Sequence, residues 1–287
     1  MMLPQMMPFL LFTVAPLAWV VYLSFTDYDG FSTPSLVGLQ NYRDLLNDAS
    51  WWHSVVVTGQ FAVLKVAFEI PLSLGLAVLL NRKLRLGGLF RTIFFLPHVV
   101  SVAILGIIFY FLLRPENGIV NGLLRSLGVL DRDFDWLGHP WSALGSLVVV
   151  GVWSGFGLNT VLFLIGLQNV PKELLESASI DGANAWQSFR LIVVPLLAPM
   201  MRVIVILTIV FTLRSFDLVK TLTDGGPAGS TDVMFTYMFG YYFSSDRGSQ
   251  IGYASALSVT ASVIIAVVSV LYLLSAQRGT SSGRTAR

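Results

Sequence analysis

Six long apolar segments constrain this chain more than any other feature of its sequence. They run roughly over residues 4–25, 54–80, 89–113, 143–169, 200–222 and 251–275. A helix of about 20 apolar residues crosses the hydrocarbon core of a bilayer. Because lipid offers no hydrogen bonds, every backbone N–H and C=O within it must be paired inside the protein, and a helix achieves this within one segment. We therefore predict an all-α membrane protein with six transmembrane helices, the first of them a retained span.

The composition excludes a soluble globular fold and several kinds of site. Apolar residues make up 55 % of the chain and charged residues 12 %, and the mean hydropathy is +0.74, values typical of an integral membrane protein. The chain has no cysteine, which excludes a disulfide framework and thiolate chemistry. The three histidines, at positions 53, 98 and 139, lack the spacing of metal ligands. We therefore predict no metal site.

Basic residues in the loops predict the side of the membrane on which each loop lies. If both termini are cytoplasmic, the inner segments carry ten basic residues and the outer loops six. Four of the inner ones cluster at Arg82, Lys83, Arg85 and Arg91. Since short cytoplasmic loops are enriched in Lys and Arg, we predict cytoplasmic termini and a cytoplasmic location for residues 170–199. No basic stripe accompanies the net charge of +2, and we expect no nucleic-acid partner.

A polar, helix-forming segment at residues 170–199 interrupts the apolar second half of the chain. Pro171 suits the first turn of a helix, and Gly182 suits the left-handed position that follows the end of one. Asn184 and Gln187 have the spacing of a capping box, which begins a second helix. The segment therefore predicts two short helices around a tight turn.

The same segment has a second interpretation as an amphipathic loop lying on the membrane. Its lipid-facing side would consist of Leu174, Leu175 and Trp186. Such a loop needs neither a helix stop at Gly182 nor a capping residue at Asn184, so the pattern favours the helix pair.

The chain lacks the motifs of the common enzyme classes. The sequence G-x-x-x-x-G-K-[ST] does not occur, so the chain has no P-loop with which to hold the phosphates of ATP. It also has no HExxH motif, no paired-carboxylate motif and no Ser/His/Asp arrangement. We therefore predict a transport subunit that is not itself an enzyme.

Residues 176–197, ESASIDGANAWQSFRLIVVPLL, resemble the EAA signature of binding-protein-dependent ABC importer permeases, in the carbohydrate branch of that family. The matching positions are Glu176, Ala178, Asp181, Gly182, Ala183, Phe189, Ile192 and Pro195. Further segments match in the expected order and extend the resemblance over nearly the whole chain: LSFTDYD (23–29), VGLQNY (37–42), FRTIFFLP (90–97), ENGIVNGLL (116–124), FDLVKTLTDGGPAGST (216–231) and IGYASALS (251–258). Ser177 stands where the family commonly has Ala, one small residue for another.

The resemblance implies a type I ABC importer permease fold in the bacterial cytoplasmic (inner) membrane, with several passes and both termini cytoplasmic. The chain would divide into a first transmembrane helix with its outer loop (1–53), a transmembrane domain (54–276) and a disordered cytoplasmic tail (277–287). The residues that the resemblance assigns to coupling with an ATPase are Glu176, Ala178, Asp181, Gly182, Ala183 and Phe189.

The resemblance also implies partners. The FD…TDGGP element is similar to that of the maltose- or glycerol-phosphate-type first permease, which implies a heterodimer with a second homologous permease subunit. Two ATPase subunits inside and a sugar-binding protein outside would complete the importer. No cofactor is expected in this chain, because ATP and magnesium would bind to the ATPase subunits. The cargo would be a sugar, such as an oligosaccharide or a related polyol.

A candidate transport path lies on the fifth span. Thr208, Phe211, Thr212 and Ser215 share one helical face and combine hydroxyls with an aromatic ring, which suits a polyol. The alternative is that these hydroxyls only bond to carbonyls of their own helix or join neighbouring helices. The resemblance implies that these four positions line the sugar site. It adds Ser154, Gly155 and Leu158 on the preceding span, where Leu158 replaces an aromatic residue of the maltose case.

Charged residues inside the spans need partners or a cavity, because an isolated charge at mid-bilayer costs about 2.5–3.5 kcal/mol. Lys65 and Glu69 are four residues apart on the second span and predict a buried structural pair, with a role in the path as the alternative. Arg214 is expected to face a cavity, to reach outward or to pair with Asp217.

Two other classes of protein remain as alternatives. An ion-coupled secondary transporter of small polar solutes would show internal inverted repeats and carboxylates within the membrane, and Glu69 alone fits that pattern. A membrane scaffold or channel would need no ATPase partner.

Overall fold

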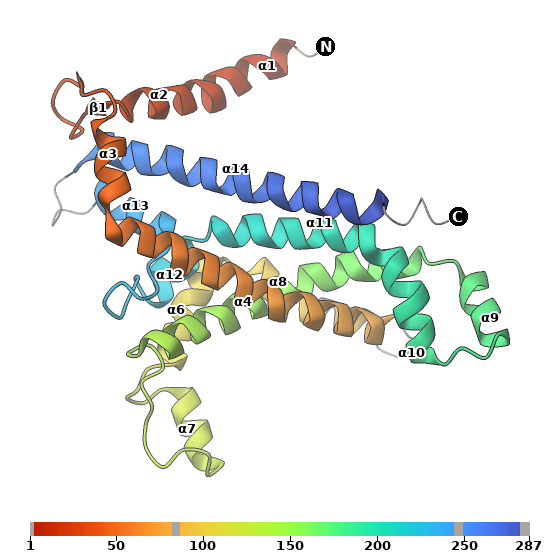
Figure 1. Ribbon diagram of the computed structural model, residues 1–287. Helices are drawn as coiled ribbons and strands as arrows, with labels where there is room; N and C mark the ends of the chain where they lie inside the picture. Colours follow the sequence, from red (N-terminus) through yellow and green to blue (C-terminus); the bar gives the residue numbers. More distant parts are fainter. Residues whose placement is uncertain (1–2, 82–86, 244–248, 282–287) are drawn as a thin grey trace.

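The computed structural model describes residues 3–81, 87–243 and 249–281, and these are mostly helical (Figure 1). The α-helices are α1 (Leu3–Phe9), α2 (Ala15–Leu23), α3 (Gln40–Asn47), α4 (Ala49–Leu80), α5 (Gly87–Val99), α6 (Val102–Leu112), α7 (Ile119–Ser126), α8 (Pro140–Gln168), α9 (Lys172–Ile180), α10 (Ala185–Ser188), α11 (Val194–Leu213), α12 (Asp217–Leu222), α13 (Met234–Phe243) and α14 (Ile251–Ser281). Two π-helical turns, η1 (Leu10–Val14) and η2 (Phe189–Val193), join α1 to α2 and α10 to α11. The strands β1 (Thr26–Asp27) and β2 (Ser35–Leu36) pair antiparallel.

Five unbroken helical segments of the described chain are long and apolar enough to cross a membrane. A sixth span exists only if α5 and α6 count as one, because these two helices meet at an angle of 93°. The prediction of one continuous helix over residues 89–113 is therefore wrong. Pro97 cannot donate a backbone hydrogen bond, and Ser101, with φ −55° and ψ 131°, has a non-helical conformation before α6. The prediction of six spans holds in this broken form.

The fifth span differs from its predicted bounds of 200–222. The helix begins at Ala185 and ends at Leu213, so the second short helix of the polar segment runs directly into the membrane span. Pro195 lies in the first turn of α11, and the π-helical turn η2 before it makes the continuation possible. Asp217 begins a separate helix, α12, whose residues had been predicted to belong to the fifth span.

The predicted boundaries at both ends of the transmembrane domain also need correction. α4 begins at Ala49, so the division between residues 53 and 54 falls within a helix. α14 continues to Ser281, so the predicted disordered tail is helical over residues 277–281. The remaining tail residues 282–287, and the basic residues at positions 82, 83 and 85, lie outside the described residues.

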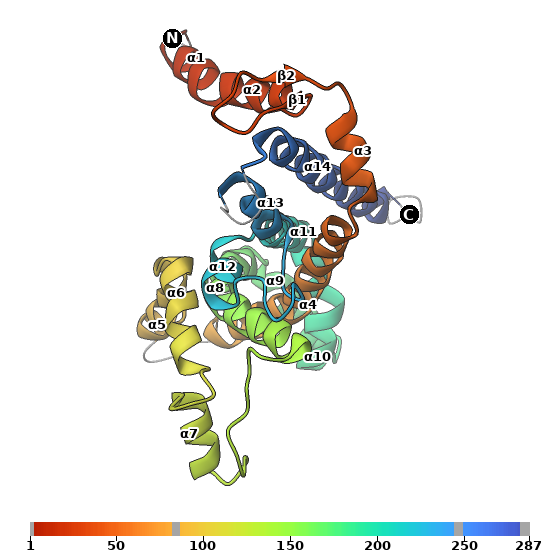
Figure 2. The ribbon, with the colours of Figure 1, turned by 90° about the vertical axis from the view of Figure 1, so that its left-hand side faces the viewer.

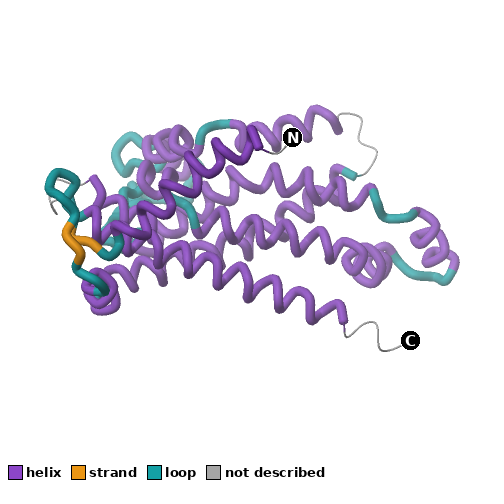
Figure 3. The backbone as a smooth tube through the Cα atoms, turned by 90° about the horizontal axis from the view of Figure 1, so that it is seen from above, coloured by secondary structure: helices purple, strands orange, loops and turns teal. Residues whose placement is uncertain are grey.

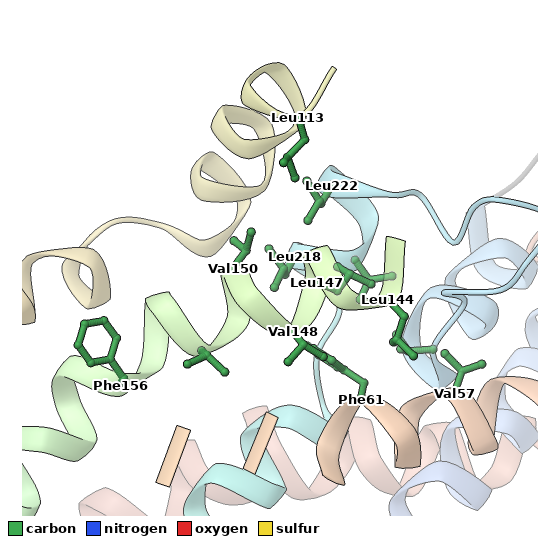
Figure 4. Packing of buried hydrophobic residues seen from close by; sticks show 13 residues of the cluster. Val57, Phe61, Leu113, Leu144, Leu147, Val148, Val150, Phe156, Leu218 and Leu222 are labelled. Carbon is green, nitrogen blue, oxygen red and sulfur yellow. The ribbon is translucent and has the colours of Figure 1, made fainter. Parts of the chain in front are cut away.

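α8 is the central helix of the bundle and packs against α4, α5 and α11. Its side chains, including Leu147 and Val150, join Phe61 of α4 and Leu218 of α12 in one buried apolar cluster (Figure 4). A second cluster, around Phe163 of α8, lies among α4, α8 and α11. Removing a large side chain from such a cluster costs about 2–5 kcal/mol, so these contacts fix α8 relative to both neighbours.

The first span, α1 to α2, lies at the edge of the bundle beside α14 (Figures 1 and 2). α2 packs against α14, and α3 connects the β-ribbon to α4. Most side chains of the first span are exposed, as expected for a helix that lipid surrounds. The ribbon lies at one end of the bundle and α9 at the opposite end (Figures 1 and 3).

Asp48 joins three helices at the ribbon end of the bundle. Its carboxylate accepts backbone hydrogen bonds from Ser50 and Trp51 and so caps α4. It also accepts hydrogen bonds from the hydroxyls of Tyr237 (2.6 Å) and Tyr253 (2.7 Å), which belong to α13 and α14. Burial by itself raises the pKa of Asp48, but these hydrogen bonds outweigh it and hold the pKa below its ordinary value of 3.8.

Replacing Asp48 by Asn should lower the stability of the chain by about 1–2 kcal/mol, because charge-assisted hydrogen bonds become neutral ones. A depressed pKa in the folded state means that this stability is present above the ordinary pKa and is lost as the pH falls through the folded-state pKa. Thermal unfolding in detergent should therefore separate the two proteins at pH 7 and bring them together only below the folded-state pKa of Asp48, which lies under 3.8. An equal separation at both pH values would show that the charge of Asp48 contributes nothing.

Candidate functional site

The polar segment forms a helical hairpin at the end of the molecule opposite the β-ribbon (Figures 1 and 3). Gly182 follows α9 with φ +83°, as predicted for a left-handed helix stop. Asn184 then caps α10: its side chain accepts from the backbone of Gln187 (2.9 Å), and the Gln187 side chain accepts from the backbone of Asn184 (2.8 Å). The predicted capping box is confirmed.

The residues predicted to couple to an ATPase divide into two groups. Glu176, Asp181 and Gly182 are exposed on the hairpin, and Ala178 and Ala183 are half-buried against each other, where the Ala183 N–H donates to the Ala178 carbonyl (2.9 Å). Phe189 instead turns inward and packs against the apolar cluster around Phe163. The structure therefore brings the first five together at the turn and places Phe189 at the base of the hairpin.

Several large apolar side chains of the hairpin point to the outside. Ile180 is 86 % exposed, and Leu174 and Trp186 are exposed as well. Leu175, which the loop interpretation assigned to the lipid side, packs inward instead. The loop interpretation is therefore wrong for Leu175, and the remaining apolar side chains border the turn at Gly182.

A cavity of about 430 Å³ lies between the helices, and it includes all seven residues of the predicted path. These are Ser154, Gly155 and Leu158 of α8, Thr208, Phe211 and Thr212 of α11, and Ser215, which follows the end of α11. Its walls come from α4, α8, α11, α12 and the break between α5 and α6. The structure thus brings the two predicted stretches of the path together in one place.

The two threonine hydroxyls of the path are already engaged by the protein. Thr208 donates to the carbonyl of Ile204 (2.9 Å), and Thr212 donates to that of Thr208 (2.6 Å). Both threonines are buried, which is the arrangement expected if they join helices. Phe211, by contrast, is 67 % exposed and supplies an open aromatic surface to the cavity.

A buried polar network lines the same cavity. Lys65 Nζ lies 3.2 Å from Glu69 Oε2, so the predicted pair forms. Asn159 Nδ2 donates to Glu69 Oε1 (2.6 Å) and to Thr208 Oγ1 (3.0 Å). Asn159 was not among the residues predicted from the sequence. The available signal was its position four residues after Gly155, itself four after Gly151, on one face of α8.

The break between α5 and α6 opens toward the cavity. Pro97, His98, Val100 and Val102 all line it, and His98 Nδ1 lies 3.3 Å from the carbonyl oxygen of Ser154. Irregular backbone at membrane depth is tolerated where it borders a cavity instead of lipid, which explains the location of the break.

Arg214 and Asp217 line the cavity as well. Within the described residues they form no ion pair with each other, so the predicted partnership is wrong. Arg214 instead satisfies the other expectation, that it would face a cavity. The described residues contain no cluster of side chains able to hold a metal ion.

Known proteins place this architecture in a family. The chain belongs to the family of binding-protein-dependent transport system inner membrane components, which it matches over residues 69–280. It is therefore a multi-pass permease of the inner membrane.

Among relatives, the trehalose/maltose transport system permease protein MalF of Thermococcus litoralis is 35 % identical, over 95 % of this chain and 91 % of that protein. The Bacillus subtilis protein named probable ABC transporter permease protein YesP is 32 % identical, over 93 % of this chain and 86 % of its own length. A solved bacterial ABC transporter for the import of alginate contains a chain with the same fold, with a TM-score of 0.83 and 23 % identity over 97 % of this chain and 94 % of that one.

The glycine at position 155 can be tested for its part in the network. A Cβ there would lie 2.5 Å from Glu69 Oε1, so Gly155→Ala should displace that carboxylate and cost about 1–3 kcal/mol. Gly145→Ala on the same helix is the control, since a Cβ there meets no atom within 4 Å and should stabilise by about 0.5–1 kcal/mol. Thermal unfolding in detergent measures both. Equal gains in melting temperature would show that Glu69 does not pack against Gly155.

Proposed function

We propose that this chain is the membrane-spanning subunit of an ATP-driven importer that carries a sugar or a related polyol. The observation that carries the proposal is the single cavity in which hydroxyls and an amide lie beside the exposed ring of Phe211. Sugars present hydroxyls at their edges and C–H groups on their faces, and this lining matches both. The names of relatives support the sugar: one is a trehalose/maltose permease, and another is named for starch degradation products.

We propose further that the energy for transport arrives through the hairpin. The chain has no P-loop, and the turn at Gly182 with the half-buried Ala178 and Ala183 forms a compact projection that a groove on an ATPase subunit can hold. In the proposed assembly two such ATPase subunits bind ATP and magnesium, and this chain binds no cofactor. The basic residues on this side support a cytoplasmic location for the hairpin and both termini.

The same proposal includes a second permease subunit and an extracytoplasmic binding protein. An apolar groove of about 960 Å³ runs along α4, α5 and α8 within the membrane-spanning segments, and a helix of the second permease would cover it. The family description supports the binding protein. A solved alginate transporter with the same fold was captured with its alginate-bound periplasmic protein.

In the proposed cycle the loaded binding protein docks on the outer loops, and the ATPase subunits close on ATP. Closure moves the hairpin, and α11 transmits the movement because α10, η2 and α11 form one continuous helix. The cavity then opens outward, the sugar passes the faces of α8 and α11, and release follows on the cytoplasmic side.

Gly182→Leu tests the coupling. The φ of +83° costs a leucine about 1–2 kcal/mol, so the turn should rearrange and both ATPase association and sugar uptake should fall. Gly182→Asn is the control, since Asn tolerates the left-handed region and should keep both. Copurification of the ATPase and uptake into proteoliposomes are the measurements. If the Leu variant binds the ATPase and transports normally, the coupling role is refuted.

Phe211→Ala tests the path. Because this ring is exposed, its loss should leave the assembled complex intact while it removes a contact of about 0.5–1.5 kcal/mol with the sugar, which lowers uptake about tenfold at most. Uptake and ATPase copurification are measured together. A loss of assembly would mean instead that Phe211 packs against another subunit.

An ion-coupled transporter is the competing function, and the Lys65–Glu69 pair inside the membrane is the observation in its favour. Uptake driven by an ion gradient without ATP would establish it. Copurifying the binding protein and identifying its bound ligand would name the sugar and exclude this alternative together.

A further inference from the structure

The polar network of the cavity joins three helices. α4 contributes Lys65 and Glu69, α8 contributes Asn159, and α11 contributes Thr208 and Thr212. Lys65 Nζ donates to Thr212 Oγ1 at 3.4 Å in addition to its ion pair with Glu69. Glu69 is 1 % exposed and Asn159 is 6 % exposed, so these groups lie deep in the bundle.

α8 is shaped to admit this network. A Cβ at Gly155 would lie 2.5 Å from Glu69 Oε1, and one at Gly151 would lie 3.3 Å from Lys65 Cε. The two glycines are one turn apart on α8, as Lys65 and Glu69 are on α4. The two glycines therefore make room for the two charged side chains. The polar lining of the cavity results from this fit between α4 and α8.

The side-chain oxygen of Asn159 is free to accept a hydrogen bond. Its amide has two N–H donors, and both are used, on Glu69 and Thr208. The ionised carboxylate of Glu69 can only accept, so the amide nitrogen must be the atom that faces it. The orientation leaves Asn159 Oδ1 as an acceptor to which no described residue donates.

That oxygen opens onto the cavity. In the described chain, three side-chain polar atoms are both inaccessible to solvent and without a hydrogen bond: Trp51 Nε1, Glu69 Oε2 and Ser230 Oγ. Asn159 Oδ1 also lacks a hydrogen bond but is not one of these, so it is accessible. Asn159 lines the cavity, as does Lys65. The ammonium group of Lys65 has three N–H donors; it forms an ion pair with Glu69 and donates one hydrogen bond to Thr212, which leaves a donor free. The polar end of the cavity thus presents one acceptor and one donor.

We propose that Asn159 Oδ1 and Lys65 Nζ together bind neighbouring hydroxyl groups of the transported sugar. A sugar hydroxyl both donates and accepts, so one hydroxyl donates to the amide oxygen while its neighbour accepts from the ammonium group. Glu69 positions both residues and does not touch the sugar. This inference rests on the proposed function and adds to it a substrate class, a solute with hydroxyls on adjacent carbons.

The geometry also explains why the predicted threonines are poor candidates for that contact. The hydroxyl hydrogens of Thr208 and Thr212 are committed to backbone carbonyls, and their oxygens accept from Asn159 and Lys65. A sugar hydroxyl could accept a hydrogen bond from either threonine only if the bond to the backbone carbonyl broke. Asn159 and Lys65 can bind it with the network intact.

The experiment compares a sugar with analogues that each lack one hydroxyl. The complete importer is reconstituted in proteoliposomes, and uptake of labelled maltose, trehalose and their monodeoxy analogues is measured for the wild type and for Asn159→Leu. Losing the contacted hydroxyl should lower wild-type kcat/KM about tenfold. The variant should take up the parent sugar and that analogue equally, because its contact is already gone.

Asn159→Ser is the second variant in case the Leu protein does not assemble, since a hydroxyl still reaches toward Glu69 while the amide oxygen is removed. Asn169→Ser is the matched control: Asn169 caps the C-terminal end of α8, where its side chain donates to the Ile165 carbonyl, and it does not line the cavity. It should keep the wild-type ratio between sugar and analogue. Lys65→Met should abolish the preference for the neighbouring hydroxyl.

Two results would overturn the inference. If an assembled Asn159 variant transports all the sugars more slowly but keeps the wild-type ratio for every analogue, Asn159 only joins helices. If the wild-type importer takes up neither maltose nor trehalose, nor the ligand that copurifies with its binding protein, the proposed function fails, and the sugar contact fails with it.

Discussion

Hydrogen bonding without water is the constraint on which this structure depends. Inside a bilayer an unpaired N–H or C=O costs several kcal/mol, and most of the chain meets this requirement by forming uninterrupted helices. The exceptions are informative. The non-helical residues between α5 and α6 border the cavity, and the buried ion pair of α4 is enclosed by α8 and α11. The break between α5 and α6 and the charged pair of α4 therefore lie at the same cavity.

The charged pair at this location is stable because its partners are supplied from other helices. A buried ion pair recovers its desolvation cost only when the remaining hydrogen-bond positions are also filled. Asn159 fills one on Glu69, and Thr212 fills one on Lys65. The same contacts connect α4, α8 and α11 deep in the membrane, where apolar packing alone would not distinguish one register from another. The hydrogen bonds that pair these charges thus also fix the register of the three helices relative to one another.

Most of the fold could be predicted from the sequence, because hydropathy and capping are local signals. The apolar segments identified the spans, and Gly182, Asn184 and Gln187 identified the hairpin. From the sequence, Pro97 indicated only a kink or a helix start. The full break after α5 was not predicted because its cause is tertiary: only the cavity beside it makes irregular backbone tolerable. The merging of the hairpin with α11 was missed because a polar segment and an apolar one can share one helix.

The site was predictable in outline and not in its hydrogen bonds. Helical spacing indicated that Thr208, Phe211 and Thr212 belong together, and the resemblance added the residues of α8. Spacing could not show that the threonine hydroxyls bond to their own helix, because that depends on side-chain rotamers. It also gave no weight to Asn159, since an isolated asparagine in an apolar span has many structural roles and its partners lie 90 and 49 residues away.

The continuity of α10, η2 and α11 relates the two candidate sites mechanically. Phe189, at the base of the hairpin, and Thr208, at the cavity, are 19 residues apart on one helix. At 1.5 Å per residue this is about 28 Å, nearly the thickness of the hydrocarbon core. Phe189 packs into the cluster shared with α4 and α8, so a displacement of the hairpin moves the hairpin end of α11 against both helices. The Asn159 network then resists at the other end, because it ties Thr208 and Thr212 to the same two helices. A helix held at both ends by different forces, apolar packing at one and hydrogen bonds at the other, can pivot only by breaking the polar contacts. A sugar bound to Asn159 Oδ1 and Lys65 Nζ would therefore contact the two residues whose hydrogen bonds resist that movement.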